Sequence, residues 1–171
     1  MNVPANAEER VPITAEGYEQ RCRELERLRN DGRRRLGELL REARSDGSVD
    51  DNPTLLDLLD EQAQLEQRIA TLEAQLAVAE VAPPPRDGRA AIGSLVRVRD
   101  VGIGDVFDCE LVGPLEADPA KGRISTAAPI GRALIGQSRG AQIEVATPRG
   151  TVALEVIDVR APSPAITKAA A

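Results

Sequence analysis

Residues 55–79, LLDLLDEQAQLEQRIATLEAQLAVA, carry apolar side chains at steps of three and four residues. This seam consists of Leu55, Leu58, Gln62, Leu65, Ile69, Leu72, Leu76 and Ala79, and Gln62 is its one polar member. Such steps place the side chains along one face of a helix, as in a coiled coil. A helix of this kind owes most of its stability to a partner that covers that face.

A second seam precedes the first and supplies that partner. It follows Thr14, a residue type able to cap a helix, and runs through Tyr18, Cys22, Leu25, Leu28, Gly32, Leu36, Leu39 and Ala43. Arg29 and Gly32 weaken its middle. The two seams predict an antiparallel coiled-coil hairpin over residues 14–82 with a tip loop at 45–53. Heptad seams also form dimers, but closing a short loop within one chain costs less entropy, so we expect a monomer.

The charges of the two halves of this hairpin are complementary. Between residues 16 and 44 there are nine arginines and seven acidic residues, whereas between 46 and 80 there are nine acidic residues and one base. The net charge of −6 therefore conceals a basic helix followed by an acidic one. This pattern favours two helices that lie side by side.

Beyond the proline-rich segment VAPPPRDG (81–88), the apolar period changes from 3.5 to 2. Expected strands are 95–98, 107–111, 124–126, 143–145 and 152–159, and Pro129 opens a short helix that ends before Gly136. The chain is thus predicted to be α+β. Its parts are an N-terminal arm (1–13), the hairpin, a hinge (83–90), a small domain (91–160) and a disordered tail (161–171).

The composition excludes several kinds of chemistry. The chain has no histidine, so it cannot build a Ser-His-Asp or Cys-His triad or a histidine-ligated metal site. Its two cysteines, Cys22 and Cys109, are too few for a zinc site and are expected to be buried thiols. No apolar run is long enough to span a membrane, and the N-terminus lacks the apolar region of a signal peptide. We therefore expect a cytoplasmic protein without a membrane partner.

Three stretches of the sequence resemble the bacterial Gre transcript-cleavage factor family. They are PITAEGYE at 12–19, EADPAKGRIS at 116–125 and PIGRALIG at 129–136, in the family's order, and the likeness extends from about Val11 to Arg160. The resemblance implies an FKBP-like second domain that docks at the rim of the RNA polymerase secondary channel. The coiled coil would enter the channel toward the polymerase's magnesium, and the protein would need no cofactor of its own.

The resemblance also implies roles for particular residues. The docking surface would include Ala127, Ala128, Pro129, Gly131 and Arg132, although the last three could equally serve the backbone geometry of a short helix. A basic patch near the RNA 3′ end would be formed by Arg33, Arg34 and Arg35, although these side chains could instead pair with the acidic helix.

The tip departs from the family pattern, which reads Gly-Asp-x-x-Glu-Asn after Ala-Arg. The residues expected near the polymerase active site are Arg44, Asp46, Ser48, Asp50, Asp51 and Asn52. Ser48 takes the place of the family's Asp, and Asp51 takes the place of its Glu. A hydroxyl is a poorer magnesium ligand than a carboxylate, although Asp50 and Asp51 could still contact the polymerase metal. Without family knowledge, the acidic residues here suit an ordinary polar turn.

These observations favour a Gre-like regulator, rather than an enzyme, that binds polymerase and inhibits transcription with weak or no stimulation of transcript cleavage. The alternative is a true cleavage factor in which Asp46 or Asp50 substitutes for the missing acid. A prolyl isomerase is a third class, suggested only by the FKBP-like fold. We reject it because Phe107 is the only aromatic residue of the second domain, which leaves no aromatic wall for a prolyl pocket. A zinc-bearing channel binder is excluded by the cysteine count and the absence of histidine.

Overall fold

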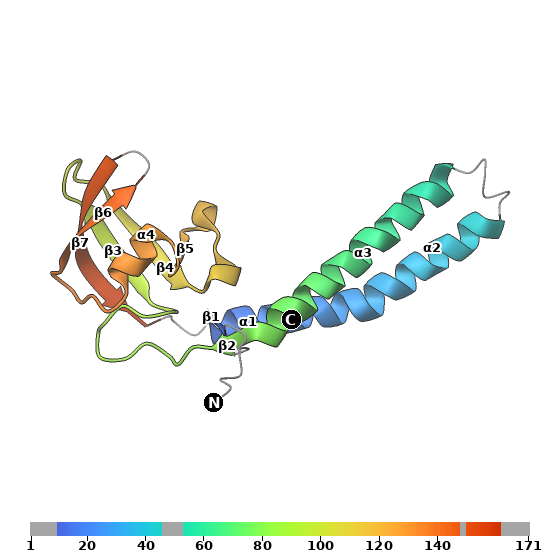
Figure 1. Cartoon of the computed structure of the whole chain (residues 1–171), viewed down its shortest axis with the longest axis horizontal. Coiled ribbons are helices and arrows are strands. Elements are labelled where there is room, and N and C mark those ends of the chain that lie inside the picture. Colours follow the sequence, from blue (N-terminus) through green and yellow to red (C-terminus); the bar gives the residue numbers. More distant parts are fainter. Residues whose placement is uncertain (1–9, 46–52, 148–149, 162–171) are drawn as a thin grey trace, which may run out of the picture. The chain divides into compact units, whose positions relative to one another are not determined.

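The computed structural model describes residues 10–45, 53–147 and 150–161, which divide into two compact units. Residues 16–79 form a helical unit, and residues 10–15 and 80–161 belong to a globular unit (Figure 1). The α+β class is confirmed. The sequence division placed an arm at 1–13 and began the hairpin at 14, whereas the structure groups residues 10–15 with the globular unit.

The helical unit is a hairpin of two long arms. The first arm contains α1 (Ala15–Arg27), a π-helical turn η1 (Leu28–Gly32) and α2 (Arg33–Ser45). The second arm is α3 (Pro53–Val78), which lies alongside α2 in Figure 1. Leu65 packs against both apolar clusters of the hairpin. The buried members of these clusters are Leu25, Leu36, Leu40, Ala43, Leu55, Ile69 and Leu72.

One member of the predicted first seam is wrong. Leu39 is 37% exposed, and Leu40, at 6%, takes its place against α3. From Leu28 through Gly32 and Leu36 to Leu40, the inward positions are spaced by four residues three times in succession. An α-helix has only 3.6 residues per turn, so the wider π turn at η1 accommodates this spacing. Arg29 and Gly32, which interrupt the heptads, both lie within that turn.

Charged side chains join the two arms, as their composition predicts. Arg29 pairs with Glu73 at 2.6 Å, and Arg33 pairs with Glu66 at 2.7 Å. A third pair runs the opposite way, from Arg68 on α3 to Glu24 on α1, at 2.7 Å. All three pairs are largely exposed to solvent, so each contributes little stability. They favour one alignment of the arms over its neighbours, because sliding either arm would separate these charges.

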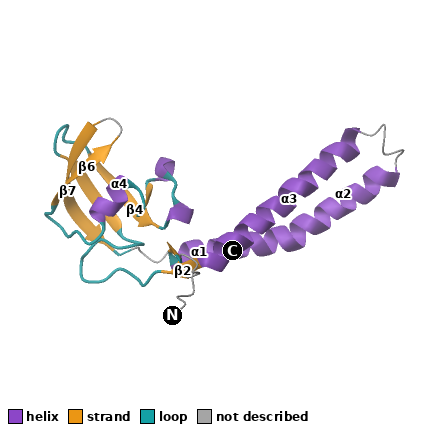
Figure 2. Ribbon diagram, viewed as in Figure 1, coloured by secondary structure: helices purple, strands orange, loops and turns teal. Residues whose placement is uncertain are grey.

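The globular unit contains a curled five-stranded sheet (Figure 2), and its strand order, β5-β4-β3-β7-β6, can be followed by the labels of Figure 1. The strands are β3 (Leu95–Asp100), β4 (Val106–Val112), β5 (Arg123–Ser125), β6 (Gln142–Thr147) and β7 (Gly150–Arg160). All neighbours are antiparallel except β4 and β5. A separate pair joins β1 (Val11–Ile13) to β2 (Ala79–Val81). Each strand predicted after residue 90 is present within a few residues.

The core of the globular unit lies between the sheet and the short helix α4 (Pro129–Leu134). Leu134 of α4 is fully buried in one cluster with Val96, Leu111 and Val156. Cys109 belongs to the same cluster, and burial raises the pKa of its thiol to about 11. The prediction of a buried thiol is therefore confirmed for Cys109, whereas Cys22 is only half-buried.

Phe107 departs from the predicted inward alternation of its strand. Its side chain is 39% exposed, because it lies at the end of β4 beside the turn that follows β3. Val101, Ile103 and Val106, around the same turn, are exposed as well. No helix in the described part of the chain combines the length and apolarity needed to cross a membrane.

The hairpin can be tested at Leu65. The substitution Leu65→Asp places a charge between the two apolar clusters and should destabilise the hairpin by about 2 kcal/mol or more. Circular dichroism during thermal unfolding measures this loss, and sedimentation should show a monomer before and after the change. The control is Leu56→Asp on the same helix, where the side chain is already 55% exposed. A stable dimer that Leu65→Asp dissociates would instead indicate a coiled coil between chains.

Candidate functional site

The loop from Ser125 to Pro129 joins β5 to α4 and is held rigidly by its own backbone. The Thr126 amide donates to the Val112 carbonyl at 2.9 Å, which extends the pairing of β5 with β4. Ser125 accepts two further amides, from Ala127 at its hydroxyl (3.1 Å) and from Ala128 at its carbonyl (2.9 Å). Three successive amides of the loop are thus satisfied internally, and the loop can be covered by another surface without orphaning them.

The predicted docking residues divide between the surface and the interior. Ala127, Pro129 and Arg132 are exposed, and Ala128 is half-buried. Arg132 lies three residues after Pro129 on α4, so the two side chains share one face of that helix. Gly131 is buried instead, and a methyl group there would overlap the carbonyl oxygen of Ser125. Gly131 therefore supports the loop from beneath and is not available to a partner.

The motif that precedes this loop is structural. Asp118 pairs with Lys121 at 2.9 Å, and this hydrogen bond holds the pKa of Asp118 below its usual value. Gly122 follows with a φ of 73°, a left-handed conformation that favours glycine. Arg123 then pairs with Glu110 at 3.2 Å and with Glu116 at 3.0 Å.

Sequence reasoning assigned no role to Glu116, although the structure buries it. The one local signal is its place three residues after Gly113 at the end of the short helix η3 (Pro114–Glu116), where a glutamate commonly accepts a backbone amide. Nothing in the local sequence indicates its other partners.

The three arginines of the predicted basic patch are successive residues at the start of α2. Successive residues of an α-helix are about 100° apart, so Arg33, Arg34 and Arg35 point in different directions. Arg33 is engaged by Glu66, whose hydrogen bond raises the pKa of the guanidinium further and lowers that of the carboxyl. Arg34 pairs with Asp31 at 3.0 Å. Within the described ranges, Arg35 has no ion-pair partner.

A different set of cations shares one face of α2. Arg34, Arg41 and Arg44 are exposed and separated by seven and then three residues, which places them along one side of the helix. Gly37 and the exposed Glu38 lie between Arg34 and Arg41, and a methyl group on Gly37 would meet no other atom within 4 Å. Arg41 and Arg44 make no ion pair with any residue that the structure describes. Sequence reasoning missed Arg41 because it looked for consecutive arginines rather than helical spacing.

Of the predicted tip residues, the structure describes only Arg44, which is exposed at the end of α2. Asp46, Ser48, Asp50, Asp51 and Asn52 lie outside the described residues. Among the residues that are described, no group of three or more acidic or cysteine side chains could hold a metal ion. The thiol of Cys109 is buried and protonated at neutral pH, so it is not a nucleophile.

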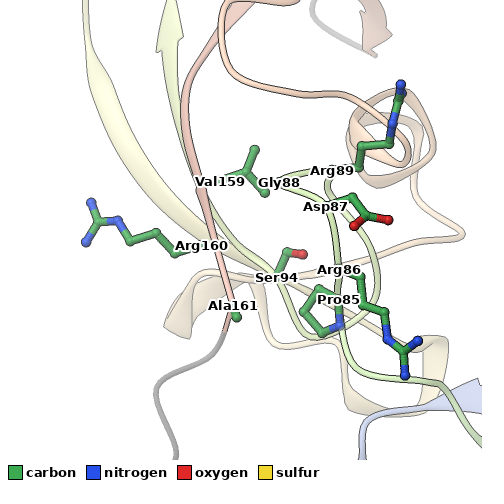
Figure 3. A pocket seen from close by; sticks show the side chains of 9 residues that line it. All are labelled: Pro85, Arg86, Asp87, Gly88, Arg89, Ser94, Val159, Arg160 and Ala161. Carbon is green, nitrogen blue, oxygen red and sulfur yellow. The ribbon is translucent and has the colours of Figure 1, made fainter.

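A cavity of about 230 Å³ beside the proline-rich segment also lacks catalytic equipment. Figure 3 shows that its three arginines, Arg86, Arg89 and Arg160, extend away from one another. Arg89 donates to the carbonyl of Gly136, and Arg160 pairs with Asp158. The cavity is otherwise lined by Pro85, Asp87, Gly88, Ser94, Val159 and Ala161. Its cationic groups do not converge on any point where a ligand would lie.

Models of known protein families match both parts of this chain. Residues 11–81 match the N-terminal domain model of the transcription elongation factors GreA and GreB, and residues 85–161 match the C-terminal model. The chain belongs to the GreA/GreB family. The boundary between the two Gre domains falls within the proline-rich segment that follows β2.

Individual Gre relatives cover the chain almost completely. The transcription elongation factor GreA of Syntrophobacter fumaroxidans is 41% identical over 88% of this chain and 98% of its own length. The GreA of Thermodesulfovibrio yellowstonii is 37% identical over 88% and 97%. Among solved structures, GreA factor homolog 1 (Gfh1) of Thermus thermophilus is 30% identical over 88% of this chain and 99% of that one, with a TM-score of 0.41.

The support that Gly131 gives to the loop can be tested by Gly131→Ala. The added methyl group meets backbone rather than a movable side chain, so the globular unit should lose about 2 kcal/mol of stability. Urea unfolding followed by circular dichroism measures the loss. Gly102→Ala is the control, because its methyl group would meet only the side-chain oxygen of Asp100, at 3.3 Å. Equal effects of the two changes would contradict a specific supporting role for Gly131.

Proposed function

We propose that this Gre-family protein binds RNA polymerase as a monomer at the secondary channel and regulates transcription without catalysing a reaction itself. The single observation that carries the docking proposal is the rigid, exposed loop of Ala127 and Pro129 beside Arg132. Relatives that are transcription elongation factors over nearly their whole length support the same role. The protein would act in the cytoplasm, where bacterial polymerase works.

The docking loop is suited to a protein surface that is partly apolar and carries an acidic group. Ala127 and Pro129 offer small apolar side chains that lose little conformational freedom on binding. Arg132 offers a planar cation for a carboxylate at the edge of that contact. Because the loop amides are already paired within the protein, covering them adds no desolvation penalty.

The altered tip supports inhibition rather than cleavage. Polymerase hydrolyses its own transcript when a second Mg²⁺ and a water are held beside the first, and that metal supplies the Lewis acid. In this protein Asp50 and Asp51 would be the tip carboxylates nearest to it, and Ser48 provides none. A hairpin that occupies the channel without completing the metal site would slow substrate entry. The proposed activity is therefore inhibition of RNA synthesis with little or no stimulation of transcript cleavage.

The basic face of α2 supports a contact with RNA close to the tip. Arg34, Arg41 and Arg44 form a row along one side of the arm, and arginine binds phosphate oxygens well. Arg33 is less available because Glu66 already binds its guanidinium group at two points. The proposed contact with the RNA 3′ end would therefore involve Arg35, Arg41 and Arg44 together with Arg34, which also pairs with Asp31 at 3.0 Å, in preference to Arg33.

A true transcript-cleavage factor is the alternative, and one feature favours it. The tip retains three acidic residues, Asp46, Asp50 and Asp51, any of which could substitute for the missing family carboxylate. The relatives named GreA belong to the same family and share more than a third of the residues. The tip experiment below separates the two activities.

Docking is tested by Pro129→Asp. The substitution places a carboxylate where the proposed contact needs a small apolar side chain, beside Arg132, whose charge it would neutralise. Polymerase binding should therefore weaken by about tenfold or more. Binding of the purified protein to core polymerase can be measured by biolayer interferometry. Ile103→Asp adds the same charge to the same unit at a side chain that is 73% exposed, and should leave binding unchanged. If Pro129→Asp folds normally and binds as tightly as the parent protein, docking occurs elsewhere.

The tip is tested by the double change Ser48→Asp with Asp51→Glu. One missing carboxylate beside a metal in a partly dry channel should lower stimulated cleavage by about a hundredfold, so the double change should restore part of it. The measurement is RNA cleavage by backtracked elongation complexes at ordinary magnesium concentration, beside a synthesis assay at saturating protein. Ser45→Asp adds a carboxylate outside the family register and should restore nothing. Strong cleavage by the unaltered protein would contradict inhibition and favour Asp46 or Asp50 as the ligand.

A further inference from the structure

The carboxylate of Glu116 is buried in the globular unit and accepts four hydrogen bonds. Its side chain is 1% exposed, and both of its oxygens accept hydrogen bonds. One oxygen accepts from the Thr14 amide at 2.8 Å and from the Gly113 amide at 3.3 Å. The other accepts from the Thr14 hydroxyl at 2.5 Å and from the Arg123 guanidinium at 3.0 Å.

Two of these four bonds connect parts of the chain that are 102 residues apart. Thr14 directly follows β1 and directly precedes Ala15, the first residue of α1. Glu116 ends the short helix η3, which belongs to the globular unit and contacts β1. The carboxylate therefore fastens the residue before the first helix to the body of the globular unit.

The backbone beside this carboxylate is shaped to admit β1. A methyl group on Gly113 would overlap the carbonyl oxygen of Pro12, so only glycine allows the strand to lie this close. Ile13 is fully buried there, and its carbonyl accepts the Ala82 amide at 2.9 Å. Three consecutive residues are thus held on the globular unit: Pro12 by its close approach to Gly113, Ile13 by burial, and Thr14 by the Glu116 carboxylate.

Burying a carboxylate is costly unless donors and an opposite charge compensate it. Here Arg123 supplies the charge, and Glu110 on the neighbouring strand holds that arginine in place. A neutral side chain would fit β1 against the domain at less cost, but it could not accept four donors. The buried carboxylate therefore fixes residues 11–14 to the globular unit, at some cost to the free energy of unfolding of that unit.

We propose that Glu116 is a positioning residue that keeps residues 11–14 on the globular unit, and that regulation of polymerase requires this attachment although docking does not. The second part rests on the proposed function, because it assumes that the globular unit docks and the hairpin acts. When the attachment is lost, the docked unit would no longer hold the first helix by its starting residue, and the hairpin would act less effectively.

The attachment is tested by hydrogen exchange measured by mass spectrometry on the full chain. In Glu116→Gln one oxygen acceptor is replaced by an amide group that cannot accept from Thr14, so residues 11–15 should exchange about tenfold faster or more. Glu155→Gln is the matched control, since it removes a carboxylate that pairs with Arg99 in the same unit and touches neither Thr14 nor Arg123. Should Glu116→Gln fail to fold, Thr14→Val removes only the hydroxyl donor and should accelerate exchange by a smaller factor. If a folded variant shows unchanged hydrogen exchange in residues 11–15, the proposed attachment is wrong. This outcome does not depend on any result with polymerase.

The functional part is tested with the same variants and core polymerase. Glu116→Gln should bind polymerase within about threefold of the parent protein, yet its effect on RNA synthesis at saturation should fall about tenfold. A merely structural role would lower polymerase binding and the effect on RNA synthesis together. The control Glu155→Gln should change neither of them. Full regulation by a variant with faster exchange overturns the functional part. If the parent protein neither binds nor affects polymerase, the proposed function fails, and the exchange result still decides the attachment.

Discussion

Burial of one apolar seam between two helical arms determines the arrangement of the helical unit. Neither arm could remain a stable helix in water with that face exposed, so each depends on the other. Leu72 and Ile69 of α3 meet Leu25 of α1 near one end, and Leu55 meets the α2 leucines near the other. Once the seam is closed, the flanking charges lie opposite partners of opposite sign. The remaining arginines of α2 are then left on the solvent side, where a partner can reach them.

The globular unit depends more on backbone fit than on the size of its core. Its α-helix α4 has six residues and packs on a five-stranded sheet, so each close contact between backbone segments contributes to the stability of the unit. Gly131 lets α4 press against the end of β5, and Gly113 lets β1 lie against η3. In both places glycine is needed for space rather than for an unusual backbone angle. Hydrogen bonds from buried polar groups then stabilise the segments that pack closely at these glycines, as Glu116 does for Thr14.

The proposed function separates binding from chemistry along the same chain. The surface that would bind polymerase is a short rigid loop in the globular unit, whereas the chemistry would depend on a few carboxylates at the tip of the hairpin. On this proposal, a Gre-family protein could retain the scaffold and the docking loop while changes at the tip alter what happens after binding. Under the proposed function, Ser48 would be the departure from the family pattern that changes the activity.

Local periodicity in the sequence determined the class of the fold and most of its elements. The steps of three and four residues predicted both arms, and the change to a period of two predicted each strand of the sheet. The family resemblance likewise predicted a docking loop at 127–129 and an altered tip, and both remain predictions. These features are encoded by residues near one another in the chain, which is why they can be read without a structure.

Tertiary contacts decided the rest. The π turn at η1 replaced Leu39 by Leu40 in the seam, because the wider turn shifts the facing residues by part of a turn. Helical geometry dispersed Arg33, Arg34 and Arg35, and only the partner arm showed that Glu66 engages the first of them. The role of Glu116 depends on Thr14, 102 residues earlier, and no local pattern encodes a contact of that separation. What a side chain does in this protein follows from its neighbours in space, and those exist only once the chain has folded.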